Sequence, residues 1–367
     1  MNVYGLTYAF TINYGTCLQA YALQNVIEKM DIFGENPKYY LIPISRSPGY
    51  FRENTKSVKK LIKKEIFKHS RKQFVSFEKR FMHYASTKDI NSFDEYNHDA
   101  DVFVCGSDVI WNPKFNHEIK RFYLDFSNKY AFSYAASFGQ SDVNPLQYPY
   151  LKELLPRLNA ISVREHQSAE IVKQCISNEE PEVCVDPVLL LKREEWEKVA
   201  EKDNQKGRHI FAYSVKTDKL LDAFVKQLSK QTKLKVIYSG GSIGSSIKQG
   251  FLNSYTPERW LQLIKDADYV VTDSFHGTAF SVIFRKNFFT IVNGDPHNGF
   301  NVRMGDFLTE LGLLRRIHST IPAEIDCSPI DFSQAENRLK EKIAYSLAYL
   351  EKNLNMAYQQ RHDAEKN

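Results

Sequence analysis

The stretch YVVTDSFHGT, residues 269–278, decides the fold of this chain and holds its main candidate for chemistry. Residues 269–272 are apolar or β-branched, which predicts a buried strand, and an apolar helix is expected from about Thr278. Ligands in open α/β sheets lie at the carboxyl ends of parallel strands. The polar corner after this strand is therefore a predicted ligand-binding position, and His276 is its titratable side chain.

Two properties of this corner favour a functional role. The first amides of a helix have no partners within the helix and carry the positive end of its dipole, so they bind phosphate or carboxylate groups. An imidazole exchanges protons near neutral pH. We expect His276 to act as acid and base, and Ser274, Gly277 and Thr278 to contact an anion. The alternative interpretation is that His276 caps the helix and Gly277 forms a tight turn.

The order of patterns on either side of this stretch predicts an α/β fold with two Rossmann-like domains that face each other across a cleft. A strand over residues 3–9 and a helix over 16–29 open the chain, and residues 209–238 repeat strand, helix and strand. The predicted division is an N-terminal domain over 1–197, a linker over 198–208, a C-terminal domain over 209–330, and a tail over 331–367 whose helix, over 331–356, crosses back to the first domain.

Composition supports a folded protein of more than one domain. The chain has 367 residues, 43% of them hydrophobic, and single cores stop growing near ~250–300 residues. Its five cysteines are scattered without CxxC spacing, which favours neither a zinc site nor a disulfide framework. We expect no metal and a reducing, cytoplasmic location. These cysteines are Cys17, Cys105, Cys175, Cys184 and Cys327.

Residues 56–81 form a predicted basic amphipathic helix. Its lysines and arginines alternate with apolar residues, so it is either a solvated face or a surface for an anionic membrane or a lipid carrier with a pyrophosphate. No nucleic-acid module accompanies it. The sequence has no recognisable signal peptide, and it has no apolar run of the ~18 residues that span a bilayer. Any membrane contact is therefore expected to be peripheral, and the sequence does not indicate an oligomeric state.

Other predicted strands also end in polar residues. Asp108 follows a strand over 101–105 and is a candidate for orienting a hydroxyl group or for pairing with a cationic group, and Trp111 is a candidate for stacking on a sugar ring. Arg164 ends a strand over 160–163, where a guanidinium suits a carboxylate or phosphate. Arg303 is expected to project into the cleft from the start of a helix. The structural alternatives are a capping Asp, a core Trp and an ion pair of Arg164 with Glu165.

Several segments resemble, in the same order, the motifs of the polysaccharide pyruvyl transferase family. The corner Ser274-Phe-His-Gly-Thr278 after a Val-Val-Thr-Asp strand is similar to the family signature. The remaining matching segments are Asn13 to Gln24, Gly106 to Asn112, Ser137 to Gly139, Ser162 to Glu165, Val185 to Pro187 and Pro257 to Trp260.

This resemblance implies the GT-B architecture and transfer of an enolpyruvyl-derived unit from phosphoenolpyruvate to a sugar diol, with no metal or other cofactor. The acceptor is then a glycan or a lipid-linked oligosaccharide of the cell envelope. His276 is the expected catalytic residue, and Arg164, Arg303, Ser274, Gly277 and Thr278 are expected on the donor. The residues expected on the acceptor are Asn13, Tyr14, Gly15, Ser107, Asp108 and Trp111.

The sequence departs from the family at one position. Many members carry Arg-Leu-His-Gly where this chain has Ser274-Phe275-His276-Gly277, so either Arg303, Arg285 or a lysine replaces the missing arginine, or the donor is held differently. Two alternatives stay open: a glycosyltransferase that uses a nucleotide sugar, and a carbohydrate-binding protein without activity. The Asp-x-Asp segments at 99–101 and 266–268 precede strands rather than follow them, so they do not favour the first alternative.

Overall fold

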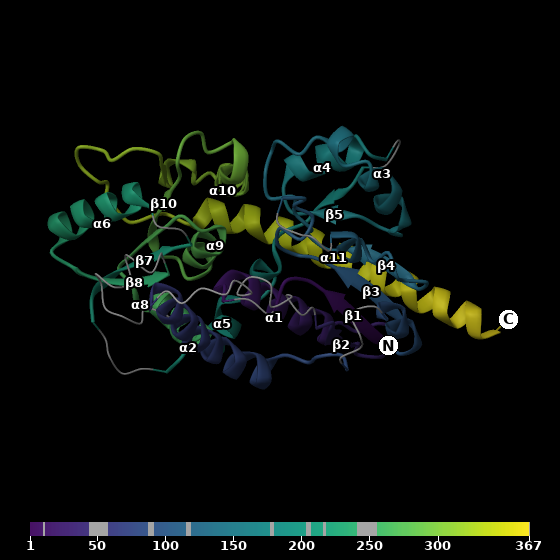
Figure 1. The fold of residues 1–367 in the computed structure, drawn as a ribbon. Helices are drawn as coiled ribbons and strands as arrows, with labels where there is room; N and C mark the ends of the chain where they lie inside the picture. The colour runs from purple at the N-terminus through teal and green to yellow at the C-terminus, as the bar shows by residue number, and fades with distance from the viewer. Residues whose placement is uncertain are drawn as a thin grey trace.

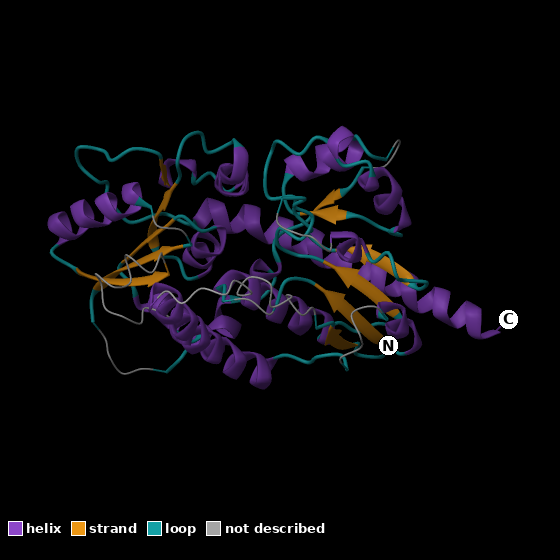
Figure 2. Cartoon of the chain, in the orientation of Figure 1, coloured by secondary structure: helices purple, strands orange, loops and turns teal. Residues whose placement is uncertain are grey.

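The structure is a computed structural model that describes residues 1–9, 12–43, 58–86, 92–114, 119–176, 180–202, 207–215, 218–240 and 255–366. Two parallel β-sheets lie side by side, each surrounded by helices, and a long helix runs along both (Figures 1 and 2). The expected pair of Rossmann-like halves is therefore present. We call residues up to Val199 the N-terminal half and residues 207–318 the C-terminal half.

The sheet of the N-terminal half has the order β2-β1-β3-β4, and all of its strands are parallel. Its central strand β3 is buried along its whole length, as its uninterrupted apolar sequence VFVC predicts for a sheet covered on both faces. A short parallel pair, β5 and β6, continues beyond β4 through single bridges. The strands are β1 (Asn2–Leu6), β2 (Lys38–Leu41), β3 (Val102–Cys105), β4 (Tyr130–Ser133), β5 (Ser162–Val163) and β6 (Glu182–Val183).

The sheet of the C-terminal half has the order β11-β10-β9-β7-β8, again with parallel pairing. Strand β9 is the one that the opening stretch predicts, and it lies in the middle of this sheet between β7 and β10. Its carboxyl end is therefore surrounded by other strand ends. The strands are β7 (His209–Ser214), β8 (Lys235–Gly240), β9 (Tyr269–Thr272), β10 (Asn287–Ile291) and β11 (Ile317–His318).

Helices connect the strands and cover both sheets. The α-helices are α1 (Tyr14–Glu28), α2 (Val58–Phe81), α3 (Tyr150–Leu154), α4 (His166–Lys173), α5 (Arg193–Val199), α6 (Lys219–Thr232), α8 (Pro257–Asp266), α9 (Phe275–Ile283), α10 (Val302–Glu310) and α11 (Ser333–Lys366). The 3-10 helices are η2 (Phe93–His98), η3 (Ile119–Tyr123), η4 (Pro145–Gln147), η5 (Leu155–Arg157), η6 (Pro187–Leu189), η7 (Gly299–Asn301) and η8 (Leu314–Arg316).

Helix α11 crosses from the C-terminal half back to the N-terminal half (Figure 1). At its start Arg285 donates to Glu336 across 2.9 Å, and further along the Tyr349 hydroxyl donates to the Ser133 carbonyl across 2.9 Å. The expected crossover helix is thus present, but it continues to Lys366, beyond the expected end at residue 356.

The two halves are joined by a continuous apolar core. The Tyr14 ring of α1 stacks on the Trp260 ring of α8 with centroids 4.9 Å apart, and the Tyr14 hydroxyl donates to the Tyr255 carbonyl across 3.1 Å. Helix α2 contacts both halves, because Phe74 and Phe77 are fully buried in this core. The halves therefore contact each other directly, and the site between them is enclosed by packed side chains.

Helix α2 is the expected basic helix, and its described part differs from a free amphipathic face. Phe74 and Phe77 are in the core, and Arg71 makes two hydrogen bonds to Glu78, across 2.6 and 2.7 Å. These groups are not free to enter a membrane. The side chains of residues 58–68, and residues 56 and 57, lie outside the described part of the chain, as do residues 203–206 of the expected linker.

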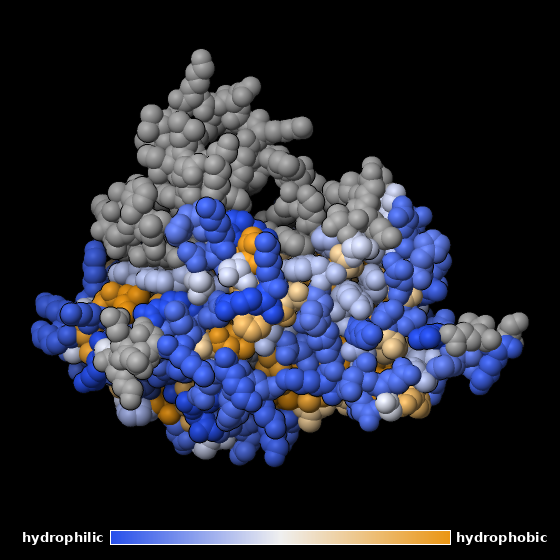
Figure 3. All heavy atoms as spheres, turned by 90° about the horizontal axis from the view of Figure 1, so that it is seen from below, coloured by the Kyte–Doolittle hydropathy of each residue, from blue (hydrophilic) through white to orange (hydrophobic). Residues whose placement is uncertain are grey.

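The molecular surface is mainly hydrophilic. On the face shown in Figure 3, apolar residues form scattered patches between polar ones. Among the described residues, no helix combines the length and the apolar character that a membrane-spanning segment needs.

Candidate active site

The corner after β9 begins its helix earlier than the sequence suggests. Helix α9 starts at Phe275, not near Thr278, because the Ser274 side chain accepts a hydrogen bond from the Gly277 amide across 3.4 Å and caps the helix. Ser274 is thus the capping residue, and the alternative that His276 caps the helix is wrong. His276 lies in the first turn of α9 instead.

The other two expected anion contacts at this corner have structural roles. A Cβ atom at Gly277 would overlap the Thr272 side chain, so this glycine allows α9 to pack on the end of β9. The Thr278 hydroxyl donates to the Ser274 carbonyl across 3.0 Å and lies 2.8 Å from the Thr290 hydroxyl. Both residues are buried, and their contacts account for them without a ligand.

The His276 ring lies where the two halves meet. Its side chain is only 7% exposed, and its Nε2 atom lies 3.4 Å from Oδ2 of Asp186 in the N-terminal half. The opposite wall is the start of α1, where a Cβ atom at Gly15 would overlap the imidazole. Gly15 was expected on the acceptor, but the structure gives it a different task, which is to leave room for the His276 ring.

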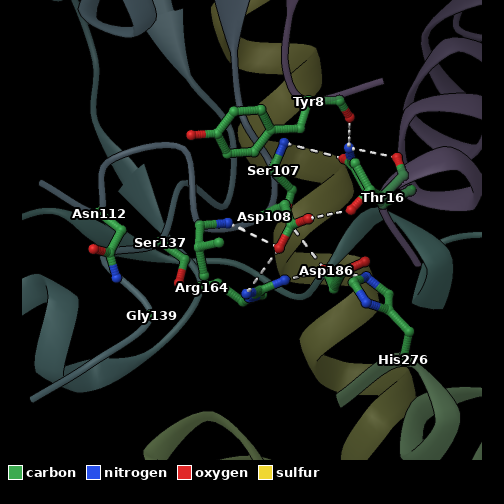
Figure 4. Close-up of polar contacts among 12 residues, drawn as sticks. Tyr8, Thr16, Ser107, Asp108, Asn112, Ser137, Gly139, Arg164, Asp186 and His276 are labelled. Atoms are coloured by element: carbon green, nitrogen blue, oxygen red, sulfur yellow. Dashed lines mark hydrogen bonds and ion pairs between the residues drawn. The ribbon is translucent and has the colours of Figure 1, made fainter. Parts of the chain in front are cut away.

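Asp186 is the central residue of this site, and the sequence analysis missed it as a functional residue. It follows β6, and its Oδ2 atom accepts hydrogen bonds from Arg164 Nη1 across 2.5 Å and from the Ser107 hydroxyl across 3.3 Å (Figure 4). Its Oδ1 atom accepts from the Val188 amide across 3.1 Å. Burial alone would raise the pKa of Asp186, but His276 and Arg164 outweigh burial and hold that pKa well below its usual range. Asp186 is therefore a carboxylate that orients both an imidazole and a guanidinium.

Arg164 combines deep burial with free hydrogen-bond donors. Its side chain is 3% exposed, and its guanidinium lies over the Phe275 ring, 4.6 Å from the centroid. Besides Asp186, its ion-pair partners are Glu165 at 3.7 Å and Asp108 at 3.9 Å. Burial alone would lower the pKa of Arg164, but these carboxylates raise it. Within the described residues, Nε and Nη2 of Arg164 form no hydrogen bond.

A second guanidinium stands near the first. Arg303 is at the start of α10, and its Nε atom also forms no hydrogen bond to any described residue. Burial and the repulsion from Arg164 lower the pKa of Arg303, whereas Asp108, Glu165 and Asp186 oppose that change. A buried and a half-buried guanidinium group, each with a buried donor that is not used, are an arrangement that a bound carboxylate or phosphate would satisfy.

Arg164, Arg303 and Asp186 line a pocket between the halves. Its walls come from the ends of β5 and β6, from α9 and α10, and from α11, and it is partly open to solvent. His276 does not line this pocket, but it contacts Asp186 and the Phe275 ring, which do. The ring of the expected catalytic residue therefore lies behind the pocket wall and not in its lining.

Asp108 and Ser107 connect this cluster to α1. The Thr16 hydroxyl donates to Oδ2 of Asp108 across 2.7 Å, and the Ser107 amide donates to Gln19 Oε1 across 3.2 Å (Figure 4). Arg164 and His276 together lower the pKa of Asp108, although burial opposes them. The expectation that Asp108 pairs with a cationic group thus agrees with its ion pair to Arg164.

Three of the expected acceptor contacts are used elsewhere. Trp111 is fully buried, stacked on Tyr123 with centroids 5.1 Å apart, and cannot offer its ring to a sugar. Tyr14 is held between Trp260 and Tyr255, as described above. Asn13 caps α1 by accepting from the Thr16 amide across 3.3 Å. Trp111 and Asn13 therefore support the fold of the N-terminal half, and Tyr14 joins that half to the C-terminal half.

Replacing Trp111 with phenylalanine is expected to reduce stability and leave acceptor binding unchanged. The Trp111 indole donates to the buried Phe122 carbonyl across 3.0 Å, and its loss leaves that oxygen without a donor, at a cost of about 1–3 kcal/mol. Urea unfolding measures this cost, and the KM for a glycan acceptor provides the second reading. A raised KM for the acceptor with unchanged stability would instead show that Trp111 contributes to acceptor binding.

Metal ligands and the Asp-x-Asp segments do not form a second site in the described part of the chain. No group of three or more His, Cys, Asp or Glu side chains there is arranged to hold a metal ion. Asp268 binds Arg208 across 2.9 Å, and Asp101 binds the Asn2 amide, both at the amino ends of strands. All five cysteines are free thiols.

The two parallel sheets, the crossover helix and the site between the halves define a two-domain protein of the GT-B class. A solved structure assigned as a UDP-N-acetylglucosamine 2-epimerase of Listeria monocytogenes has this fold, with a TM-score of 0.51 and 10% identity over 97% of this chain and 90% of the other. The ADP-heptose lipopolysaccharide heptosyltransferase II of E. coli is also similar, with a TM-score of 0.42 and 10% identity over 95% and 99%.

The sequence profile of polysaccharide pyruvyl transferase matches residues 13–296, most of the chain. The chain therefore belongs to the polysaccharide pyruvyl transferase family, which implies a transferase that acts on a glycan. Among curated proteins, none matches the sequence.

Proposed function

We propose that this protein transfers pyruvate from phosphoenolpyruvate to a sugar diol of a cell-surface glycan or its precursor and forms a cyclic ketal. The observation that carries the proposal is the pair of guanidinium groups, the buried Arg164 and the half-buried Arg303, which both line one pocket and have buried donors that form no hydrogen bond within the described residues. Phosphoenolpyruvate carries a carboxylate and a phosphate close together, and both are bound well by guanidinium groups. Arg303 thereby takes the place of the arginine that the family carries where this chain has Ser274.

In the proposed reaction the donor gains one proton on its methylene carbon, and each of the two hydroxyl groups of the diol loses one proton. The methylene carbon of the donor takes a proton from His276 while the first sugar hydroxyl bonds to C2 of the donor and loses its own proton. The bond from C2 to the phosphate oxygen then breaks, and phosphate leaves with one proton. The second hydroxyl bonds to C2, and its proton returns to the imidazole, so the products are the ketal and hydrogen phosphate.

Asp186 supports the proposed role of His276. The carboxylate lies 3.4 Å from Nε2, so it fixes the ring and stabilises the protonated imidazole. His276 stands behind the pocket wall in the absence of substrate, and catalytic contacts of this kind shorten when substrate binds. An acid and base in this position contributes about 10²–10⁴ in rate.

The direct test of this function measures donor binding and turnover separately. Phosphoenolpyruvate is expected to raise the melting temperature, and phosphate release is expected only when a glycoside with a free diol is added, with an acceptor mass that shows the ketal. The acceptor panel contains methyl galactosides, glucosides and mannosides, free and linked to a polyprenyl pyrophosphate. Stabilisation by nucleoside diphosphates alone would favour the nucleotide-sugar glycosyltransferase, and absence of any turnover would contradict the transferase.

The location that we propose is the cytoplasm, with charge-based contact to an anionic membrane through α2. Lys72 of this helix is exposed, whereas Phe74 and Phe77 are used in the core, so the proposed contact depends on lysine and arginine charge rather than on apolar insertion. Sedimentation with vesicles that contain phosphatidylserine tests it. Binding that disappears as salt is raised supports the proposal, and equal binding to neutral vesicles contradicts it.

A further inference from the structure

The pocket of Arg164 and Arg303 is also lined by the Asp306 carboxylate, which accepts no hydrogen bond within the described residues. Asp306 lies three residues after Arg303 on α10, so the two side chains share one face of the helix and both line the pocket. The Asp306 side chain is 22% exposed. Nδ1 of His297 lies 3.7 Å from its Oδ1 atom, and within the described residues no hydrogen bond to its carboxylate is present.

The charged neighbours of Asp306 make its carboxylate a better proton acceptor. Burial is the main reason that the pKa of Asp306 is raised; Glu165 and Glu310 raise it further, and His166 and His297 oppose the change. The other acids at the pocket have partners. Glu165 accepts from the Ser137 hydroxyl across 2.8 Å through Oε1, and its Oε2 atom, which forms no hydrogen bond within the described residues, lies 3.7 Å from Arg164 Nε. Asp186 binds Arg164 across 2.5 Å, and Glu310 accepts from His166 Nε2 at 2.8 Å and from Lys342 Nζ at 2.9 Å.

Four of the residues expected on the acceptor have structural roles, so they offer no partner to the acceptor hydroxyl, whereas α10 offers a carboxylate. Trp111, Tyr14 and Asn13 are occupied by the fold, and Gly15 faces the His276 ring. A sugar hydroxyl donates well to a carboxylate. Asp306 also lies beyond residues 13–296, the part that the family profile matches, so the family assignment gives it no role.

We infer that Asp306 receives the attacking hydroxyl of the sugar acceptor and takes its proton, which makes α10 the shared binding element for donor and acceptor. This inference rests on the proposed function. As the hydroxyl oxygen bonds to C2 of phosphoenolpyruvate, the hydroxyl proton passes to the Asp306 carboxylate. When the bond from C2 to the phosphate oxygen breaks, this proton passes to the leaving phosphate, so Asp306 is a carboxylate again after each turnover.

The test compares Asp306→Asn with the unchanged protein on both substrates. Asparagine keeps the size of the side chain and removes the proton acceptor. We expect the melting temperature to rise with phosphoenolpyruvate as in the unchanged protein, while glycoside-dependent phosphate release falls by about 10²–10⁴. Asp306→Glu, which keeps a carboxylate, is expected to retain more activity than Asp306→Asn.

Asp94→Asn is the matched control, because Asp94 is exposed and does not line the pocket, and it is expected to leave both readings unchanged. Asp306→Asn with unaltered phosphate release would overturn the role of Asp306 and leave the proposed function standing. Loss of the donor effect on melting in Asp306→Asn would also overturn it, because the carboxylate would then serve the donor. If the unchanged protein neither binds phosphoenolpyruvate nor releases phosphate, the proposed function fails and this inference falls with it.

Discussion

Replacing Arg164 with methionine is expected to destabilise the protein by about 3–5 kcal/mol and to abolish the response to phosphoenolpyruvate. The guanidinium is the hydrogen-bonded cation of Asp186, which is fully buried, and it also lies near Glu165 and Asp108. Without it, these carboxylates remain buried with less compensating charge. Urea unfolding gives the free energy of unfolding, and melting with and without phosphoenolpyruvate gives donor binding.

A double variant separates the two roles of Arg164. In Arg164→Met with Asp186→Asn, the uncompensated carboxylate is gone, so we expect much of the lost stability to return. Donor binding is expected to stay lost, because the free Nε and Nη2 donors are still missing. A double variant that again binds phosphoenolpyruvate would show that Arg164 only neutralises Asp186, and a single variant of normal stability would show that the ion pair is not needed for folding.

The sequence was sufficient for the architecture because the relevant patterns are local. Buried strands such as β3 and β9 are short apolar runs, and α1 and α11 have helical periodicity. Parallel pairing then places the strand ends at one edge, which explains why Arg164 and His276 were found as candidates. Apolar runs and helical periodicity can each be read from a single segment of the chain.

The predictions that were missed or wrong concern residues whose side chains contact segments far away in the sequence. Asp186 looks like an ordinary residue before a proline, and only the tertiary fold brings it to His276, which is far away in sequence. The sequence leaves Trp111 either on a sugar or in the core because exposure cannot be read from sequence, and the structure confirms the core position, packed on Tyr123. Gly277 and Gly15 share the same absence of a side chain, yet one accommodates Thr272 and the other the His276 ring.

The start of α9 shows the same limit at the level of one turn. Apolar residues indicate a helix from Thr278, but Ser274 supplies the cap and begins the helix at Phe275. The shift moves His276 from the corner into the first helical turn. Asp306 is not a candidate in the sequence, because an acid within an amphipathic helix normally faces solvent. It lines a pocket because the fold brings α4, α9 and α11 close to it.

His276→Gln is expected to lower phosphate release by about 10²–10⁴ while phosphoenolpyruvate still raises the melting temperature. Glutamine is similar in length but does not titrate, and His276 is outside the pocket lining that holds the donor. Turnover and melting curves are the two measurements. If His276→Gln loses donor binding together with turnover, the imidazole acts by holding the donor or the Arg164 and Asp186 pair rather than by moving a proton.

Gly15→Ala is also expected to lower phosphate release, because it displaces the His276 ring instead of replacing it. This variant therefore tests whether the position of the ring is needed for turnover. The added methyl group would overlap the imidazole, so the ring has to leave its position beside Asp186. In the His276→Gln background the same methyl group has no catalytic ring to displace, so we expect Gly15→Ala to add little there. Gly207→Ala is the matched control, because no atom lies near the methyl group that it introduces. Equal and additive losses from Gly15→Ala in both backgrounds would show that Gly15 acts independently of His276, and the contact between α1 and this ring would then have no part in turnover.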